Sequence, residues 1–260
     1  MITEDRYARA ARGWATGAAR VYGPLAHDLV AAAPHPLAGR RVLDAGAGTG
    51  LVSQALADVG ARPVAVDLSL DMLAWDAARR PPAAAGAVDA LPLADGVVDD
   101  VVAAFVLNHV SDPGAALAEL IRVTRAGGAL LGSVYATTNH SPARDRIDDV
   151  VRAHGWSAPA WYAHLKTAQA PLLGDGPAMT AGAHAAGLVD VDVREYDADI
   201  GLDRAPDLVD YRLGQAHVAA WLAGQDDRAR ESLRAAAIAA VAPVMAPYRP
   251  RVVRLLARVR

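Results

Sequence analysis

The sequence predicts an α/β fold: a doubly wound, mostly parallel sheet with an antiparallel strand near one edge, and helical lid segments. Short apolar strands alternate with helical segments between residues 41 and 135, which is typical of parallel sheets. The first of these strands runs directly into a glycine loop that opens a helix. Further on, residues 188–196 alternate apolar and polar side chains, which is the period of a strand with one solvent-exposed face.

The glycine-rich half of the chain contains the clearest elements. Residues 41–44 form a short apolar strand, and residues 51–58 form a helix that stops at Gly60. A second buried strand covers residues 63–67. Ser69 then caps a helix that we expect to continue to about Ala78.

The next elements continue the alternation. Residues 84–87 are a weak third strand, and the unbroken apolar run at 99–106 is a fourth, of the kind that helices cover on both faces. Asp112 and Pro113 begin a helix that runs to about residue 124, and residues 129–135 form a fifth strand.

The flanking segments are predominantly helical. Residues 1–33 form an amphipathic helical preface, and residues 207–222 and 229–244 are predicted helices. Residues 136–180 show no clear strand and helix unit, which is typical of a lid. Arginines at helical spacing make residues 251–260 ambiguous, and we interpret them as the final strand.

Composition excludes several classes of function. The chain has no cysteine, so disulfides, thiolate zinc sites and cysteine nucleophiles are ruled out. A net charge of −3 gives no general attraction to nucleic acid. No apolar stretch reaches the roughly 18 residues of a membrane span, and the first residues lack a secretion signal. We therefore expect a cytoplasmic location without stable membrane insertion.

The glycine loop has the spacing Asp44-x-Gly46-x-Gly48-x-Gly50. A dinucleotide fingerprint would need a glycine at position 51, where a leucine stands. Asp67 ends the second strand and can accept hydrogen bonds from ribose hydroxyls. S-adenosylmethionine (SAM) has no pyrophosphate; its amino-acid end suits backbone N–H donors with a nearby carboxylate such as Asp44.

An ordered set of motifs resembles the class I SAM-dependent methyltransferases, a family with a Rossmann-like fold. Residues 42–50 resemble the family's first motif, 65–69 its second, and 89–95 its adenine-contacting segment. Residues 105–110 and 118–128 are similar to later motifs of the type 11 subgroup, which includes ubiquinone and menaquinone methyltransferases. The resemblance is specific over residues 39–135.

This resemblance implies that SAM is the cofactor. The glycines would line its methionine part, Asp67 would hold the ribose, and Tyr22 would close over it, while Met72 can alternatively be simple core. The full set of expected cofactor-binding residues is Tyr22, Asp44, Gly46, Gly48, Gly50, Asp67, Leu68, Met72, Asp89, Ala90, Phe105 and Asn108.

Methyl transfer from a sulfonium depends mainly on alignment and desolvation, so a dedicated base is optional. His109 follows the fourth strand and is our candidate general base, with a pocket-lining or structural role as the alternatives. Trp156, Trp161 and Tyr162 are candidate walls for an apolar acceptor, or simple packing residues. We expect no metal, because no histidine pair has metal-ligand spacing.

We interpret the chain as one methyltransferase domain, residues 1–260. Within it we expect an N-terminal helical lid at 1–38, a SAM-binding half at 39–135, an inserted substrate lid at 136–180, and C-terminal strands and helices at 181–260. The expected acceptor is a small, mostly apolar molecule, quinone-like or from secondary metabolism, methylated on oxygen, nitrogen or carbon. A homodimer is compatible with the sequence.

Two alternatives remain. The chain could keep the SAM fold without methylating, as a binding protein or a cyclase, because the cofactor motifs would look the same. A nicotinamide-dependent oxidoreductase is the other, opposed by the glycine spacing, although Tyr162 and Lys166 have the spacing of a short-chain dehydrogenase pair.

Overall fold

A mixed sheet forms the centre of the molecule in the computed structural model, which describes residues 6–260. Within these residues the sheet has seven strands in the order β3-β2-β1-β4-β5-β7-β6. Strands β1 to β5 are parallel, whereas β7 runs antiparallel to both β5 and the edge strand β6. The strands are β1 Arg41–Ala45, β2 Arg62–Asp67, β3 Ala83–Ala85, β4 Asp100–Ala104, β5 Ala129–Tyr135, β6 Val189–Asp197 and β7 Arg251–Arg258.

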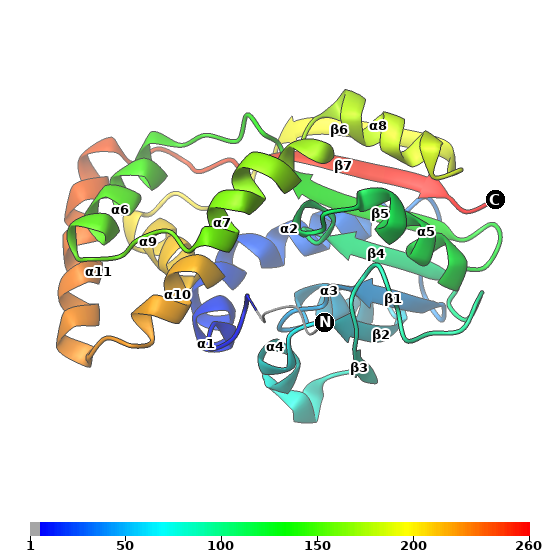
Figure 1. Cartoon of the computed structure of the whole chain (residues 1–260), viewed down its shortest axis with the longest axis horizontal. Coiled ribbons are helices and arrows are strands. Elements are labelled where there is room, and N and C mark those ends of the chain that lie inside the picture. Colours follow the sequence, from blue (N-terminus) through cyan, green and yellow to red (C-terminus); the bar gives the residue numbers. More distant parts are fainter. Residues whose placement is uncertain (1–5) are drawn as a thin grey trace.

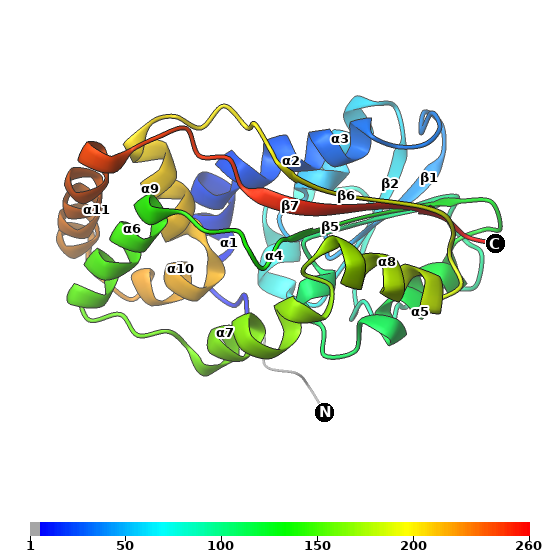
Figure 2. The ribbon, with the colours of Figure 1, turned by 90° about the horizontal axis from the view of Figure 1, so that it is seen from above.

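Helices cover both faces of this sheet (Figure 2). On one face, α2 (Ala19–Ala31) and α3 (Leu51–Asp58) pack against the apolar side chains of β1, β4 and β5. On the other, α5 (Pro113–Val123) and α8 (Gly176–Ala185) bury their apolar stripes. Covering on both faces explains why β4 and β5 are almost wholly buried.

A second helical group lies beyond the carboxyl ends of the parallel strands (Figure 1). Its core joins α2, α6, α9 and α11 to the start of β7. Its elements are α1 Ala11–Gly13, the π-helical η1 Trp14–Ala18, α6 Pro142–Ala153, α7 Ala160–His164, η4 Leu165–Gln169, α9 Ala205–Gly214, α10 Ala216–Leu222 and α11 Asp227–Val241. Short elements complete the chain: α4 Leu70–Ala74, η2 Ala77–Arg79, η3 Leu107–His109, η5 Ala170–Leu172 and η6 Ala242–Val244.

The N-terminal preface is docked onto α9 through a close approach of two glycines. A β-carbon added at Gly17 would lie 2.2 Å from the carbonyl oxygen of Asp210, and one at Gly214 would lie 2.4 Å from the carbonyl oxygen of Gly13. Only glycine permits this contact between backbones. The contact places the aromatic residues of the preface at the carboxyl edge of the sheet.

The structure confirms the predicted fold class, the antiparallel edge strand and the assignment of residues 251–260 to a strand. Two local predictions were wrong. The helix expected to reach Ala78 ends at Ala74, because Trp75 is extended and Arg80 donates to the Met72 carbonyl. The helix expected at 207–222 breaks at the extended Gln215. The segment expected to be a substrate lid, residues 136–180, contains the helices α6 and α7 and the first half of α8.

Across the part of the chain that the structure describes, no helix combines the length and apolarity that crossing a bilayer would require.

Candidate functional site

The glycine loop between β1 and α3 is held by the backbone of β2. The N–H groups of Gly46 and Ala47 both donate to the Val66 carbonyl, at 2.8 and 3.0 Å. Gly46 has φ +73°, and an added β-carbon would lie 2.6 Å from a methyl group of Val106. Conformation and space therefore both require glycine at this position.

Asp67 stands at the carboxyl end of β2, facing the glycine loop. Its carboxylate accepts hydrogen bonds from the backbone N–H groups of Gly48 and Ser69, both at 2.7 Å. The Ser69 hydroxyl in turn caps α4 through the Met72 N–H, at 3.4 Å. This chain of bonds orients a half-buried carboxylate at the strand edge where open α/β sheets bind ligands.

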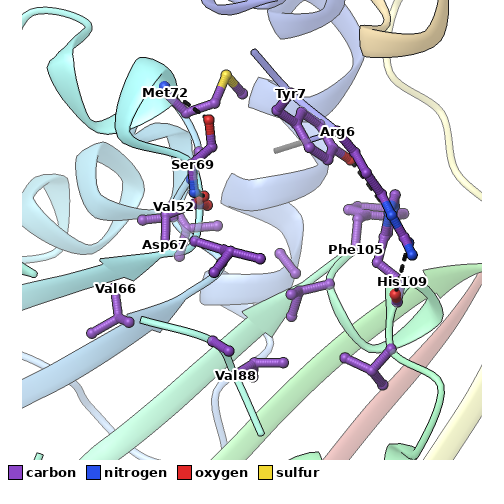
Figure 3. A pocket seen from close by; sticks show the side chains of 18 of the residues that line it. Arg6, Tyr7, Val52, Val66, Asp67, Ser69, Met72, Val88, Phe105 and His109 are labelled. Atoms are coloured by element: carbon purple, nitrogen blue, oxygen red, sulfur yellow. Dashed lines mark hydrogen bonds between the residues drawn. The ribbon is translucent and has the colours of Figure 1, made fainter. Parts of the chain in front are cut away.

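A cavity of about 320 Å³, the first cavity, opens between these segments and the N-terminal preface. Figure 3 shows two facing walls, with Asp67, Ser69 and Met72 opposite Arg6, Tyr7, Phe105 and His109. Leu68 borders the cavity and is 49% exposed although it is large and apolar. A flat ring bound here would cover that side chain.

Asp44 lies behind the glycine loop and off the cavity wall. It is almost fully buried, and the Ser53 hydroxyl donates to one of its oxygens at 2.6 Å, while the other oxygen has no partner within residues 6–260. Burial raises the pKa of Asp44 to about 6. This carboxyl group therefore ties the end of β1 to α3 through Ser53.

His109 ends η3, just after β4, and lies where the first cavity meets a second one. Both ring nitrogens are within 3.5 Å of the Tyr7 hydroxyl, and Arg6 donates to the His109 carbonyl. Burial, followed by the charge of Arg6, lowers the pKa of His109 to about 4. At neutral pH the imidazole is uncharged and can accept a proton.

The second cavity, of about 260 Å³, lies between the sheet edge and the helical group. It shares Tyr7, Trp14, Tyr22, Phe105 and His109 with the first cavity. Its other walls carry aromatic and polar side chains, among them Tyr135, Arg144, Trp161, Tyr162, Gln215 and His217.

Aromatic contacts build the boundary between the two cavities. Tyr22 stacks on Trp14 with ring centroids 4.6 Å apart, and its edge meets Phe105 at 5.1 Å. Phe105 has φ +54°, a conformation that non-glycine residues rarely adopt and that is concentrated at functional sites. This backbone turn directs the Phe105 ring onto the ring of Tyr135, and the two ring centroids are 4.7 Å apart.

Most residues selected from the sequence lie on these walls. The first cavity is lined by Tyr22, Gly46, Gly48, Asp67, Leu68, Met72, Asp89, Phe105 and His109, and the second also by Asn108, Trp161 and Tyr162. Four residues lie on neither wall: Asp44, Gly50, Ala90 and Trp156. Trp156 is buried instead, and its indole N–H donates to the His217 carbonyl at 2.8 Å.

Sequence reasoning missed several wall residues, chiefly Arg6, Tyr7, Arg144, Arg212, Gln215 and His217. None of them belongs to a motif. Arg144 and Arg212 have the appearance of ordinary helix-surface arginines, and only the docking of α6 and α9 turns them toward a cavity.

Comparison with known proteins agrees with this geometry. Residues 43–132, which hold the glycine loop, β2 to β4 and the first half of β5, match the family model described as "Methyltransferase domain". This segment of the chain is therefore similar to methyltransferase domains, and the match favours a methyltransferase over a nicotinamide enzyme.

Curated relatives named demethylmenaquinone methyltransferase match half of the chain or less. The protein of Renibacterium salmoninarum is 42% identical over 130 residues, which are 49% of this chain and 53% of that protein. The protein of Mycolicibacterium paratuberculosis is 46% identical over 103 residues, 40% of this chain and 45% of its own. The chain thus spans about half the length of these relatives.

Solved structures share the fold. Haemonchus contortus phosphoethanolamine N-methyltransferase 2, solved with S-adenosylhomocysteine and phosphomonomethylethanolamine, is 19% identical with a TM-score of 0.59, covering 90% of this chain and 52% of that one. The [4+2]-cyclase SpnF is 21% identical with a TM-score of 0.55, and the match covers 92% of this chain and 81% of that one.

Proposed function

We propose that this protein transfers a methyl group from SAM to an oxygen, nitrogen or carbon atom of a small, mostly apolar acceptor. The observation that carries the proposal is the pair of cavities that share Tyr22, Phe105 and His109. A cofactor in the first cavity and an acceptor in the second would meet at that shared wall. The printed names of the curated relatives support a quinone-like acceptor.

The residues of the first cavity fit SAM. The Asp67 carboxylate would bind the ribose hydroxyls, and Leu68, Met72 and Val88 would pack on the adenine. The glycine loop allows close backbone approach at Gly46 and Gly48. When bound, SAM supplies a methyl group on a positively charged sulfur, which is activated for displacement.

The shared wall would exclude water and control the acceptor's proton. Trp14, Tyr22 and Phe105 form an aromatic partition that would hold the acceptor in line and keep the site dry. His109, neutral at pH 7 because its pKa is low, would take a proton from an acceptor hydroxyl or acidic carbon. The absence of a metal from this chemistry stays a prediction.

Calorimetric titration with SAM, S-adenosylhomocysteine and NADH tests the cofactor assignment. We expect micromolar binding of the two sulfur nucleotides and none of NADH. Asp67→Ala should lose at least about 2 kcal/mol of that binding free energy. Binding of NADH alone would refute the proposal, and cofactor binding without transfer to any of a panel of acceptors would favour the non-methylating alternative.

We further propose that the protein is cytoplasmic, acts on a free small molecule rather than on nucleic acid, and works as a single domain. Its net charge of −3 supports the choice of acceptor class. A homodimer remains compatible with this proposal, and light scattering of the purified protein would measure the number of copies.

A further inference from the structure

The charged side chains that line the second cavity are all cationic. Arg144, Lys166 and Arg212 line it, whereas none of the described lining residues is an aspartate or a glutamate. A mostly apolar acceptor by itself would not require three cations. Whether the acceptor needs a negative charge depends on which of these cations already pair with an acidic side chain of the protein.

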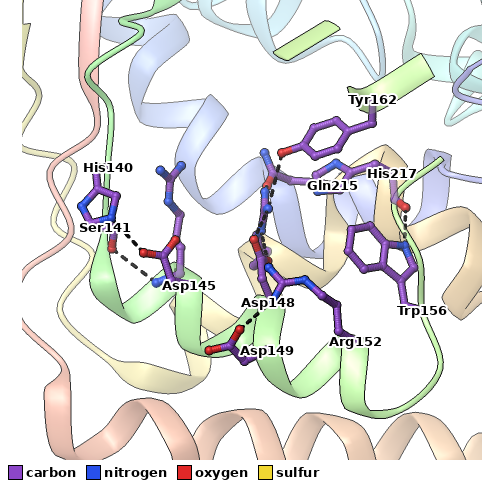
Figure 4. A network of polar contacts seen from close by, with 12 residues as sticks. His140, Ser141, Asp145, Asp148, Asp149, Arg152, Trp156, Tyr162, Gln215 and His217 are labelled. Carbon is purple, nitrogen blue, oxygen red and sulfur yellow. Dashed lines mark hydrogen bonds and ion pairs between the residues drawn. The ribbon is translucent and has the colours of Figure 1, made fainter. Parts of the chain in front are cut away.

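Arg212 is neutralised by a single carboxylate. Its Nε and Nη2 donate to the two oxygens of Asp148, each at 2.7 Å, in a bidentate pair. Gln215 and Tyr162 accept further bonds from the same guanidinium (Figure 4). Arg212 therefore brings no excess charge, and its bonds fix the side chains around it.

The other acidic side chains of α6 form ion pairs with residues other than Arg144. Asp145 pairs with His140 at 2.8 Å, and Asp149 pairs with Arg152 at 2.6 Å (Figure 4). Together with the bond from Asp148 to Arg212, these pairs occupy every acid near Arg144 on its own helix.

Arg144 has only neutral partners among residues 6–260. Its Nη1 donates to the Tyr248 hydroxyl at 3.1 Å, its Nη2 donates to the Asn139 carbonyl at 2.8 Å, and its buried Nε has no partner. No carboxylate of the described residues lies within 4.0 Å of it. An arginine stays protonated in proteins, so this guanidinium is a largely buried cation without a counter-ion.

The walls around Arg144 are suited to a flat apolar body. Tyr162 and His217 stack with ring centroids 3.8 Å apart and an angle of 4° between planes, and Trp161 meets the edge of Tyr162. Lys166 lines the same cavity with an exposed side chain. Aromatic faces bind planar molecules, and a guanidinium binds planar oxyanions.

We propose that the second cavity takes an anionic acceptor: a flat apolar body carrying a carboxylate or phosphate group that binds Arg144, with Lys166 adding attraction. This inference deepens the proposed function and rests on it in one respect, namely that the acceptor occupies the second cavity. The anion would supply the counter-ion that Arg144 lacks and would fix which end of the acceptor faces the shared wall at His109.

Three probes of one shape test the proposal: 2-naphthoate, 2-naphthyl phosphate and the uncharged 2-naphthamide. Each is titrated calorimetrically into the full chain saturated with S-adenosylhomocysteine. We expect at least one anion to bind about 10-fold or more tightly than the amide, which corresponds to about 1.4 kcal/mol. The anion that binds more tightly shows whether the cavity prefers a carboxylate or a phosphate group.

Variants of α6 assign the preference to one side chain. Arg144→Met should bring the anion down to the affinity of the amide, and Arg144→Lys should keep part of the preference. Arg146→Met is the matched control, an exposed arginine two residues away on the same helix, and should change nothing. Affinity for S-adenosylhomocysteine shows that each variant is folded, because Arg144 does not line the first cavity.

The proposal fails if the amide binds as tightly as both anions, if neither anion binds, or if Arg144→Met keeps the preference while still binding S-adenosylhomocysteine. Failure of the proposed function looks different: S-adenosylhomocysteine itself would not bind, whatever the second cavity prefers.

Discussion

The first cavity takes most of its wall from consecutive segments between residues 46 and 111, whereas the second takes most of its wall from side chains scattered over the helical group. The first relies on backbone: the loop at Gly46, the N–H groups that bind Asp67, and the strand ends. The second relies on side chains such as Arg144 and Tyr162. The shape of the first cavity is therefore fixed mainly by backbone, whereas that of the second depends on which side chains the helical group presents.

The largest expected effect comes from filling the glycine loop. Gly46→Ala forces φ +73° on a residue with a β-carbon and places that carbon against Val106. Because left-handed backbone costs about 1–3 kcal/mol and the clash adds to it, we expect affinity for S-adenosylhomocysteine to fall at least about 100-fold by calorimetry. Gly23→Ala, where an added β-carbon meets nothing within 4 Å, is the control. Undiminished affinity in Gly46→Ala would mean that the loop does not bind the cofactor.

Removing the imidazole tests the shared wall. His109→Gln should lower kcat about 100-fold if the residue is a general base, because general bases contribute 10²–10⁴-fold. Since the pKa of His109 is about 4, the wild-type rate should be flat from pH 6 to 8 and fall only in more acidic solution. A wild-type inflection near pH 6.5 that disappears in the variant would contradict the lowered pKa, and an unchanged kcat would leave only a lining role.

The buried Asp44 should make stability depend on pH. Its folded-state pKa, about 6, lies above the ordinary 3.8, so the folded state holds the proton more tightly than the unfolded state does. The contribution of Asp44 to the free energy of unfolding is therefore fully present below pH 4. It is lost as pH rises through 6, and the loss is up to about 3 kcal/mol.

Urea unfolding at pH 4.5 and 7.5 measures this effect. Asp44→Asn keeps the bond to Ser53 but cannot ionise, so it should lose less stability than the wild type between these two values. Exposed Asp203→Asn serves as the control and should follow the wild type. Equal slopes for all three proteins would show that Asp44 does not carry the dependence.

The smallest expected effect separates the two cavities. Trp161→Ala removes one aromatic wall of the second cavity and should raise the KM of the acceptor roughly 2- to 10-fold, the value of one aromatic contact of about 0.5–1.5 kcal/mol. The Kd of S-adenosylhomocysteine should not change, because Trp161 does not line the first cavity. A parallel loss of cofactor affinity would mean that the two walls are energetically coupled.

The sequence by itself determined the elements whose signals are local. Apolar runs, the glycine loop and the capping residues Ser69 and Asp112 act over a few neighbouring residues, so they located β1, β2, β4 and β5 and the starts of α4 and α5. The same locality placed Asp67 on the first cavity, because the carboxyl ends of parallel strands share one edge.

Only the tertiary structure decided the acceptor side. Periodicity does not reveal that β7 lies between β5 and β6, that Arg80 ends α4, or that Gly17 and Gly214 bring two helices into contact. The sequence placed Trp156 in the acceptor wall, yet it lies in the core, while Arg144 and His217 line the cavity without any motif. The physical reason is that such walls depend on packing between segments far apart in the chain, and that packing leaves no periodic trace in the residues themselves.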